Sequence, residues 1–494
     1  MLSQWGRRIT AGLLVLAAAY VGATWWAGKQ IEKFYMAAPS WQLPLSWQAV
    51  LLNDESHIEL VPHSFERGLF HSTATFSLHV VGTSLPIHSI EWQQHIEHGP
   101  FPWSRVKRLQ WLPVLAAGTV RLARDEWLAN VVEVMPEGWA REISQAVRVR
   151  YQVGLSGATE TTFTAAPLQL ASDELDWQSD ALAMTLRMDK DGYLDTFSSH
   201  IDALAFRAQE AASPLYLQIG LQEAALNVDQ QSKRDGRLRF HSRAETQQIH
   251  VHLEDKRSHD TLEVRLDGLM SVHNNDATIT ASDTFIHHAT SDFTIQQVAI
   301  NGRELGRLQA DWDMENVNVG VLSVFANEQD ENIVPSMESL LEALLAPQPK
   351  IELKKLAWQN EGGEAVLNVV ARLAPNEMLA PTQGLLPKAN AKAALRFDRG
   401  MLQQLSEDVA SLSTQYIEGS ERAEMAEEIA QYEDWLDELV ALKVLQQKDE
   451  QYSLDAEVEL EQGLRLFLNS YEITEGEIMA LWFMLMLLFN GASP

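Results

Sequence analysis

Histidine and carboxylate side chains are the groups in this sequence that could carry acid–base or metal chemistry. The 494 residues include 15 His and 68 Asp plus Glu. His95 and His98 lie close together, but Gly99-Pro100 follows them and no helical pattern holds both. His250 and His252 share the polar side of a predicted strand, which suits an exposed face as well as a ligand pair. Zinc needs three or four convergent ligands. The spacings supply no such set, so we predict no metal and no other cofactor.

Motifs for nucleophilic catalysis and phosphate binding are also absent from the sequence. It contains no cysteine, which excludes disulfides, thiolate metal ligands and cysteine nucleophiles. It has no Gly-rich phosphate loop and no G-x-S-x-G turn, and its carboxylates are too numerous for one pair to stand out. We therefore predict a protein that is not an enzyme. An unrecognised hydrolase stays open as an alternative.

The charge of the chain limits its partners. With 38 basic and 68 acidic residues, the net charge is −30. Binding to nucleic acid needs clustered Lys and Arg, so we predict no nucleic-acid partner. Arg105, Lys107 and Arg108 form the clearest cationic spot of the body, and a solvated face explains them better than contact with lipid phosphates. The acidic stretch 418–438 is also best explained as a solvated helix face.

Residues 9–27 form an uncharged run of 19 residues that follows Arg7 and Arg8. A helix needs roughly 20 apolar residues to cross a hydrocarbon core about 30 Å thick. The run therefore predicts a transmembrane helix, with a tryptophan pair at the far interface. The anchor residues are Leu13, Leu14, Val15, Leu16, Val21, Trp25 and Trp26.

A cleaved secretory signal is the alternative for this run, with residues 17–19 as the cleavage site. The apolar run continues beyond that site, which favours an anchor that is retained. Lys29 and Lys33 follow the run and weaken the positive-inside bias. The simpler orientation still keeps the short basic N-terminus in the cytoplasm, so that the body is exported.

Apolar and polar residues alternate along most of the body. Ala74 and Phe76 alternate with Thr73 and Thr75, a period that places one set on a buried sheet face. The same alternation recurs at residues 147–155, 182–188, 249–253, 262–266, 308–314 and 454–460. Turn signals separate the strands, among them Asp235-Gly236 and Asn274-Asn275.

Other stretches predict helices. Residues 335–346 carry a leucine-rich stripe, residues 401–445 form the longest helical region, and two short helices flank Pro136. Residues 478–489 are 12 residues without a polar group, too few to span a bilayer as a helix. This tail suits a core helix, the lining of a groove or a segment that dips into the membrane, and the three interpretations stay open.

Two sequence blocks are more specific than these patterns. One is Arg67-Gly68-Leu69-Phe70, followed by His71-Ser72, and the other is His98-Gly99-Pro100-Phe101-Pro102. Both resemble the signature of the YdgA-like family, which are bacterial proteins of unassigned function. Residues 25–32, 293–322 and 460–474 also resemble that family, the last two weakly. The chain departs from it at His71-Ser72, where paired serines are usual, and at Asn469-Ser470, where Asn-Gly is usual.

The resemblance implies one N-terminal helix in the bacterial inner membrane, a periplasmic body and no catalytic residues. Together with the alternation, it predicts a mainly β fold with flanking α (α+β). A single transmembrane helix would precede an extended, curved antiparallel sheet with helices packed at the ends. The predicted segments are a tail (1–8), the anchor (9–27), a helix and linker (28–45), an α+β region (46–200), a β-rich region (201–400) and a helical C-terminal region (401–494).

For function, the sequence favours a membrane-anchored periplasmic protein that takes part in maintaining the cell envelope. It would bind or pass an apolar ligand, a lipid or a segment of an envelope protein, along a β-rich groove. A scaffold that forms a homo-oligomer or docks envelope partners is the main alternative. These interpretations rest on the alternating strands and the apolar tail, and on analogy with other membrane-tethered β-rich proteins.

Overall fold

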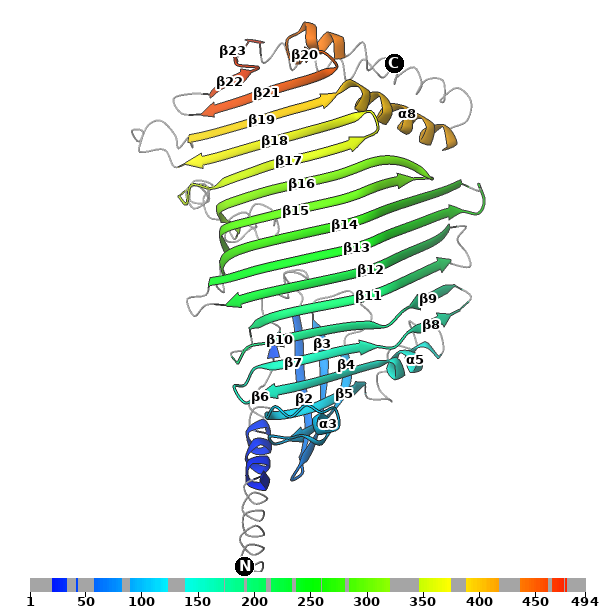
Figure 1. The fold of residues 1–494 in the computed structure, drawn as a ribbon, viewed down its shortest axis with the longest axis vertical. Helices are drawn as coiled ribbons and strands as arrows, with labels where there is room; N and C mark the ends of the chain where they lie inside the picture. Colours follow the sequence, from blue (N-terminus) through cyan, green and yellow to red (C-terminus); the bar gives the residue numbers. More distant parts are fainter. Residues whose placement is uncertain are drawn as a thin grey trace, which may run out of the picture. The chain divides into compact units, whose positions relative to one another are not determined.

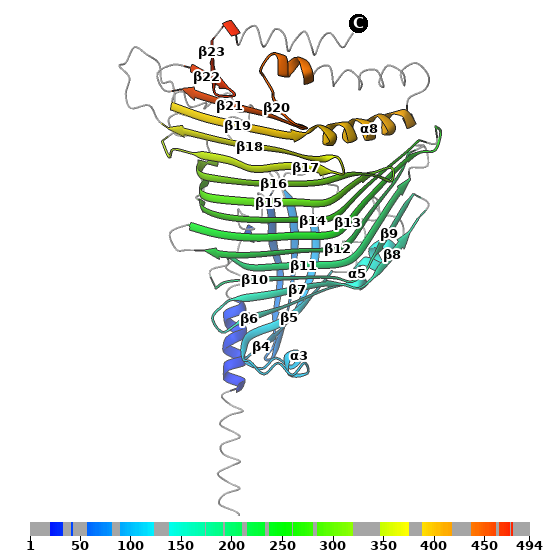
Figure 2. The same cartoon turned by 45° about the horizontal axis from the view of Figure 1, so that its top comes forward.

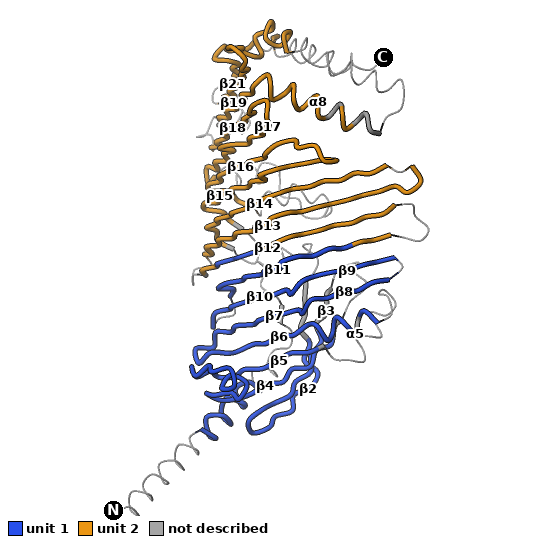
Figure 3. Tube along the Cα trace, turned by 45° about the vertical axis from the view of Figure 1, so that its right-hand side comes forward, with its two compact units in different colours: residues 1–206, 225–229 blue, residues 207–224, 230–494 orange. Residues whose placement is uncertain are grey.

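β-Strands make up most of the residues that the structure describes, and few helices accompany them there, as the alternation predicted. The computed structural model divides the chain into two compact units. Unit 1 comprises residues 1–206 with 225–229, and unit 2 comprises residues 207–224 with 230–494 (Figure 3). The structure describes residues 20–32, 41–42, 57–81, 89–122, 138–172, 174–190, 193–209, 215–232, 237–258, 260–279, 284–319, 346–374, 388–416, 436–460, 464–474 and 476–477.

Unit 1 contains an antiparallel sheet whose strands pair mostly with their sequence neighbours (Figure 1). The pairing runs unbroken from β1 to β7, and β7 then pairs with β10. Its elements are β1 (Trp41–Gln42), β2 (His57–Arg67), β3 (His71–Val81), β4 (Ser89–His98), α3 (Trp103–Val106), β5 (Val114–Leu122), α5 (Trp139–Ala146), β6 (Val147–Gly154), β7 (Thr159–Ala165), β8 (Leu168–Ala171), β9 (Leu175–Ser179), β10 (Leu182–Met188) and most of β11 (Leu194–Gln209).

The core of unit 1 follows the predicted alternation along β3. Ala74 and Phe76 are buried, at 0% and 8% exposed, whereas Thr73 and Thr75 are half-buried. Ala74 clusters with residues of β4 and β5 and of the N-terminal helix, because small side chains there let the strands and the helix approach closely. The cluster consists of Ala74, Ile96 and Ala116, packed against Ile31, Phe65 and Tyr151.

The predicted transmembrane run falls only partly within the described residues. Residues 9–19, which include Leu13, Leu14, Val15 and Leu16, lie outside them. Residues 20–32 form one helix, so the helix continues past the end of the run at residue 27. Among the helices that the structure describes, none combines the length and the apolar composition needed to cross a bilayer.

Unit 2 is an antiparallel meander with longer strands. Each strand from β13 to β19 pairs with the next, and β19 pairs with β21. Its elements are β12 (Leu215–Ser232, shared with unit 1), β13 (Arg237–Asp255), β14 (Asp260–Ile279), β15 (Thr284–Ile300), β16 (Arg303–Asn318), β17 (Lys350–Asn360), β18 (Gly363–Ala374), β19 (Lys388–Asp398), α8 (Arg399–Tyr416), β20 (Gln446–Lys448), β21 (Gln451–Leu460), β22 (Leu464–Leu468) and β23 (Tyr471–Ile473).

The long strands of unit 2 bend along their length, which Figure 2 shows for β13 to β16. Gly268 in β14 and Gly306 in β16 have φ angles of 62° and 122°, which favour glycine. The register shifts by one or more residues between Ile295 and Val298. Irregular residues of this kind bend a strand and increase its twist, so the predicted curvature has a local cause.

The turn predicted at Asn274-Asn275 is wrong, because both residues lie inside β14. Asn275 pairs with Phe240 of β13. The Asn274 side chain bonds His241 Nδ1 at 2.7 Å and donates to Thr290 Oγ1 at 3.2 Å. An amide can donate and accept at once. The two adjacent strands therefore hold this dipeptide in an extended conformation, although the same dipeptide favours a turn in isolation.

The helix predictions had mixed outcomes. α8 begins two residues before the predicted region 401–445, and residues 436–441 near its end are also helical. α5 matches the second of the two short helices expected around Pro136. Residues 442–445, at the end of the predicted region, form turns and bends instead. The helix at 335–346 up to residue 345, the first short helix before Pro136, the turn at 235–236 and the apolar tail 478–489 lie outside the described residues.

The hairpin at Asn469-Ser470 keeps a tight turn although serine stands where glycine is usual in the resembling family. Leu468 of β22 pairs with Tyr471 of β23. Both turn residues have positive φ angles, 48° and 70°, as a two-residue hairpin turn requires. The Asn469 side chain also donates to the carbonyls of Lys443 and Val444 at 2.9 and 3.0 Å, which ties the turn to the segment after helix 436–441.

Candidate functional site

The sheet of unit 2 has one apolar face, which follows from the strand register. Residues paired across strands share a face, and so do residues two apart along a strand. Leu356, Leu367, Leu395 and Leu454 therefore form one row across β17, β18, β19 and β21. The next two rows are Leu353, Val369, Ala393 and Ala456, and then Ile351, Ala371, Ala391 and Val458. These twelve residues are called the apolar face below.

One side of the apolar face is covered. The adjacent row contains Phe397 and Tyr452, which are 6% and 1% exposed and whose rings stack 5.3 Å apart. Met401 of α8 and Leu436 and Leu439 of helix 436–441 pack on this row. The two helices thus form the hydrophobic core of unit 2 at this edge.

The apolar face itself is open in comparison. Its side chains are half-buried or exposed, and Leu356 and Ile351 are 36% and 42% exposed. Burying such a side chain fully would gain roughly 1.5–3 kcal/mol relative to full exposure. Part of that stabilisation is therefore not realised within the protein.

The opposite face of the same strands carries charged side chains, several of which form ion pairs. The Lys354 ammonium lies 2.9 Å from Asp313, and the Lys392 ammonium lies 2.7 Å from Glu457. Burial opposes ionisation of Asp313, but Lys354 and His288 outweigh it and hold the pKa of that carboxyl below its usual value. The hydrogen bond from Lys392 likewise lowers the pKa of Glu457.

A shallow depression of about 590 Å³ lies over β17 to β22, and Lys354, Lys392 and Glu457 are among the residues that line it. Because these three charged groups are already engaged in ion pairs, they stabilise the sheet rather than offer a free charge to a ligand. The depression therefore supports no acid–base chemistry by these groups.

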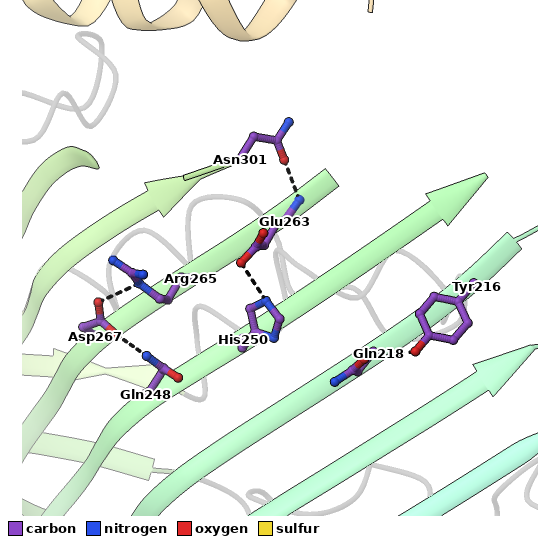
Figure 4. Close-up of polar contacts among 8 residues, drawn as sticks. All are labelled: Tyr216, Gln218, Gln248, His250, Glu263, Arg265, Asp267 and Asn301. Carbon is purple, nitrogen blue, oxygen red and sulfur yellow. Dashed lines mark hydrogen bonds and ion pairs between the residues drawn. The ribbon is translucent and has the colours of Figure 1, made fainter. Parts of the chain in front are cut away.

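Polar contacts continue on β13 and β14, where Figure 4 shows them side by side. His250 Nε2 lies 3.1 Å from a Glu263 carboxylate oxygen. Gln248 donates to Asp267 at 2.8 Å, and Arg265 donates to the same carboxylate at 3.0 Å. The sequence left open whether His250 and His252 form a ligand pair, and the structure instead joins His250 to a carboxylate on the next strand.

These contacts form an ordered polar surface. The side chains of His250 and Glu263 are 29% and 48% exposed, so water reaches both. His252 meets the ring of Tyr216 edge-on, with centroids 5.8 Å apart. Across the described ranges, no three His, Asp or Glu side chains are grouped so that they could hold a metal ion.

The two sequence blocks come together in unit 1, around the helix of residues 20–32. The backbone N–H of His98 donates to the carbonyl of Phe70 at 2.8 Å, which joins one block to the other. The Tyr20 hydroxyl donates to the Phe101 carbonyl at 3.1 Å, and the Tyr20 ring stacks on Phe70 at 6.5 Å. Thr24 is fully buried in this contact. We call the contact of helix 20–32 with residues 67–71 and 98–102 the helix seat.

Two glycines allow the close approach in the helix seat. A Cβ atom on Gly28 would lie 2.6 Å from Nδ1 of His98. Gly99 has a φ of 92°, and a Cβ there would lie 2.5 Å from Oγ1 of Thr24. Both distances are shorter than van der Waals contact, so only glycine fits without displacement at these positions.

Ionic and cation–π contacts fix the helix on one side of the seat. Arg67 Nη1 lies 2.6 Å from a Glu32 carboxylate oxygen, with both side chains about one-third exposed. The guanidinium of Arg67 and the ammonium of Lys29 lie 5.9 and 5.3 Å from the ring centre of Trp25. Contacts of this kind at exposed sites contribute about 0.5–1 kcal/mol each.

His98 is the most strongly perturbed titratable group of the helix seat. Its side chain is 2% exposed, and burial lowers its pKa to about 4, with further contributions from the nearby His71, Arg67 and His95. The imidazole is therefore neutral at neutral pH. His95, on the other face of β4, is exposed, so the pair noted in the sequence does not converge.

Of the remaining residues of the two blocks and of the predicted anchor, some are buried in unit 1 and others are exposed to solvent. Pro102 is buried and precedes α3, and the Pro100 carbonyl accepts from the N–H of Val114 at 3.1 Å. Leu69, Phe70 and Phe101 are 46%, 45% and 40% exposed. Gly68 N–H donates to the His71 carbonyl and forms the first turn. On the helix, Val21, Trp25 and Trp26 are 37%, 45% and 53% exposed.

Sequence reasoning missed the partners of the blocks. Thr24, Ala27 and Gly28 form the buried side of helix 20–32, and their small size and near-helical spacing were a readable signal. We assigned the first two of these residues to the membrane-spanning run instead.

Comparison with known proteins agrees with the sequence blocks. A family model described as a bacterial protein of unknown function (DUF945) matches residues 8–468. Protein YdgA of Escherichia coli (strain K12) is 20% identical over 73% of this chain and 74% of its own length. An uncharacterized protein of Haemophilus influenzae is 24% identical over 39% of this chain, and the match spans about half of that protein, 53%. No solved structure matches the chain.

The family match covers nearly the whole chain and includes the helix seat as well as the sheet of unit 2. The YdgA-like resemblance read from the two blocks is thereby confirmed. The chain belongs to the DUF945 family of bacterial proteins, whose function is unknown.

Proposed function

We propose that this protein is a non-enzymatic module of the bacterial cell envelope that is anchored in the inner membrane through residues 9–27, lies mostly in the periplasm, and binds and passes on lipid acyl chains along the apolar face of unit 2. The observation that carries the proposal is the alignment of three apolar rows across four paired strands, with side chains left half-buried or exposed.

The chemistry of the face favours an acyl chain over an extended polypeptide. The backbones of β18 and β19 are paired on both sides, so a second strand can only lie on top of their side chains. An extended polypeptide placed there would leave its own N–H and C=O groups against an apolar surface, which costs several kcal/mol per group. An acyl chain has no such groups.

Energetics favour passing a lipid on rather than trapping it. Each CH₂ group moved from water onto the face gains about 0.8 kcal/mol. A CH₂ group that arrives from a bilayer is already out of water, so its transfer is nearly neutral. A face of this kind would exchange acyl chains with a membrane and still hold them against the aqueous phase.

Adjacent alanines provide a matched test. Ala393 lies on the apolar face, and Ala394 lies on the polar face opposite Asn368 and Asp455. The full-length protein would be purified from membranes, extracted with solvent and its bound lipid measured by mass spectrometry. Ala393→Gln should reduce co-purifying lipid about tenfold, because burying an unpaired amide costs about 1–3 kcal/mol. Ala394→Gln should leave the lipid unchanged.

Two outcomes would contradict the proposal. Equal lipid recovery from both variants would mean that the lipid sits elsewhere, and no lipid from the unmodified protein would remove the function. If crosslinking at the apolar face instead joins two copies or captures an envelope protein, the scaffold alternative gains support.

A further inference from the structure

In the helix seat, residues 67–71 and 98–102 contact the start of helix 20–32. The proposed anchor needs this part of the helix to be long enough to cross the membrane. As a helix, residues 9–19 would span about 16 Å, at about 1.5 Å per residue, which is half of a hydrocarbon core. A full crossing therefore also requires the helical turns that contain Tyr20 and Thr24. Those turns are packed against the two blocks: Tyr20 contacts Phe70 and Phe101, and Thr24 is fully buried. In such a crossing Tyr20 and Thr24 lie in the outer half of the core rather than in water, so the loops that hold these turns must contact the membrane.

The surface of these loops has the composition that such a position requires. Residues 101–112 and the neighbouring Leu69 and Phe70 expose large apolar side chains, and α3 lies beside helix 20–32 in both views (Figures 1 and 2). Their exposed fractions are 63% for Trp103, 76% for Leu109, 61% for Trp111 and 78% for Leu112, with 40–46% for Leu69, Phe70 and Phe101. We call these seven residues the collar. Tryptophan and leucine grouped in this way are typical of residues at a membrane interface.

The charge of the collar differs from that of the whole chain. Residues 101–112 contain three basic residues and no acidic one, in a protein of net charge −30. Lys107 and Arg108 are exposed, and the Lys107 ammonium lies 5.6 Å from the ring centre of Trp103. Arg105 is buried instead and donates to the carbonyl of Leu112 at 3.2 Å. One arginine thus holds the loop in shape, while two cations remain at the surface beside the apolar side chains.

We propose that the collar inserts into the interfacial region of the bilayer around helix 20–32, with Lys107 and Arg108 at the level of anionic phosphate headgroups. The proposal rests on the anchor of the proposed function and adds a second membrane contact to it. The occupant is a lipid surface, because the exposed apolar side chains, the adjacent cations and the anchor end all lie together in unit 1. This assignment revises the solvated face that the sequence favoured for the basic residues.

The absence of cysteine makes the test direct, since a single introduced thiol is the only labelling site. Leu112→Cys places a probe on the collar. Gln145→Cys is the control. Gln145 is exposed on α5, near the first residue of β6. The other end of β6 is Gly154, which pairs with Val114 close to the collar. Each full-length variant would carry a small fluorophore and be reconstituted in vesicles of phosphatidylcholine with phosphatidylglycerol.

The expected result is opposite quenching of the two probes. A nitroxide on the lipid acyl chain should quench the probe at position 112 and spare the one at 145, whereas aqueous iodide should quench the probe at 145 and spare the one at 112. Equal access of iodide to both would overturn the proposal. Protection of position 112 from iodide without lipid quenching would also overturn it, because it would indicate contact with a second copy.

Charge reversal tests the headgroup contact separately. The double variant Lys107→Glu/Arg108→Glu should lose lipid quenching at position 112 in vesicles with phosphatidylglycerol. Arg141→Glu/Arg148→Glu, which reverses two exposed charges near α5, should not. Unchanged quenching in the first variant would overturn the headgroup contact.

Carbonate extraction distinguishes a failed collar from a failed anchor. If the protein stays in the membrane pellet while the probe at 112 is aqueous, the collar is wrong and the anchor stands. If carbonate releases the protein, both the collar and the proposed anchoring fail.

Discussion

The helix seat of unit 1 and the apolar face of unit 2 bury apolar surface in different ways. In the seat, Thr24 and Ala27 are 0% and 2% exposed, and Gly28 and Gly99 have no space for a Cβ atom. On the apolar face, twelve side chains lie in register but remain half-buried or exposed. The seat is closed and depends on particular residues, whereas the face is open and depends on a pattern.

This difference explains why the recognisable sequence blocks fall in the seat. Where the backbone lies against another backbone segment or a ring, only one residue type fits, so the contact restricts which amino acid can occupy each position. On an open sheet face, any apolar residue with the right parity maintains the surface. A pattern of that kind leaves a periodicity but no signature, which fits the weak resemblance of the later strands to the family.

The largest expected effect is at the centre of the seat. Gly28→Leu should destabilise the docked helix by about 3 kcal/mol, because the new side chain overlaps the His98 ring. Gly22→Leu, on the same helix with nothing within 4 Å of its Cβ position, should be neutral or slightly stabilising. Hydrogen exchange of residues 20–32 in detergent measures both. Equal exchange rates of residues 20–32 in the two variants would show that the helix seat accepts a larger side chain at position 28, as the open apolar face would.

The next effect is the pH dependence of the seat. Burial first, and then the nearby His71, Arg67 and His95, lower the pKa of His98 to about 4, whereas in an unfolded chain this pKa is near 6.5. Below pH 6.5 the unfolded state binds a proton that the folded state does not. Stability is therefore fully present above that pH and is lost as the pH falls toward 4, by on the order of 2 kcal/mol at pH 5.

Thermal unfolding at pH 7 and pH 5 tests this dependence, with the near-ultraviolet signal of the tryptophans as the readout. His98→Gln should reduce the loss between the two pH values. The control His200→Gln removes an exposed histidine paired with Asp202 and should retain the loss. An unchanged slope in His98→Gln would mean that other groups control the acid sensitivity.

A smaller effect is expected on the apolar face. Leu356→Ala should cost about 1 kcal/mol, well below the 2–5 kcal/mol of a buried leucine, because the side chain is 36% exposed and leaves no closed cavity. Leu439→Ala, at a residue of the covering helix 436–441 that is 6% exposed, should fall in the higher range. Chemical denaturation measures both, and similar losses would show that the face is closed in solution.

The smallest effect concerns the hairpin of β22 and β23. Ser470→Gly should stabilise unit 2 by about 0.5–1 kcal/mol, because Ser470 has a φ of 70°, which glycine adopts without strain. Ser453→Gly, inside β21, should instead destabilise it. A shift of the denaturation midpoint is the measurement, and a loss of stability in Ser470→Gly would contradict the turn geometry.

Local patterns predicted much of the fold and less of the candidate site. The alternation around Ala74 and Phe76 located β3, and Gly99 with the two following prolines located a turn. Asn274-Asn275 misled because isolated asparagines favour turns, while His241 and Thr290 on adjacent strands bond one of them inside β14. His95 and His98 suggested a pair, yet strand geometry sends them to opposite faces.

The sequence by itself determined that this protein is a β-rich member of its family, with an apolar N-terminal run and strands of two-sided character. These properties follow from periodicity and composition, which are local. Only the tertiary structure decided which apolar residues align across β17, β18, β19 and β21, and that Gly28 faces His98 seventy residues away. Register and close approach depend on contacts between distant segments, and no short stretch of sequence contains both partners.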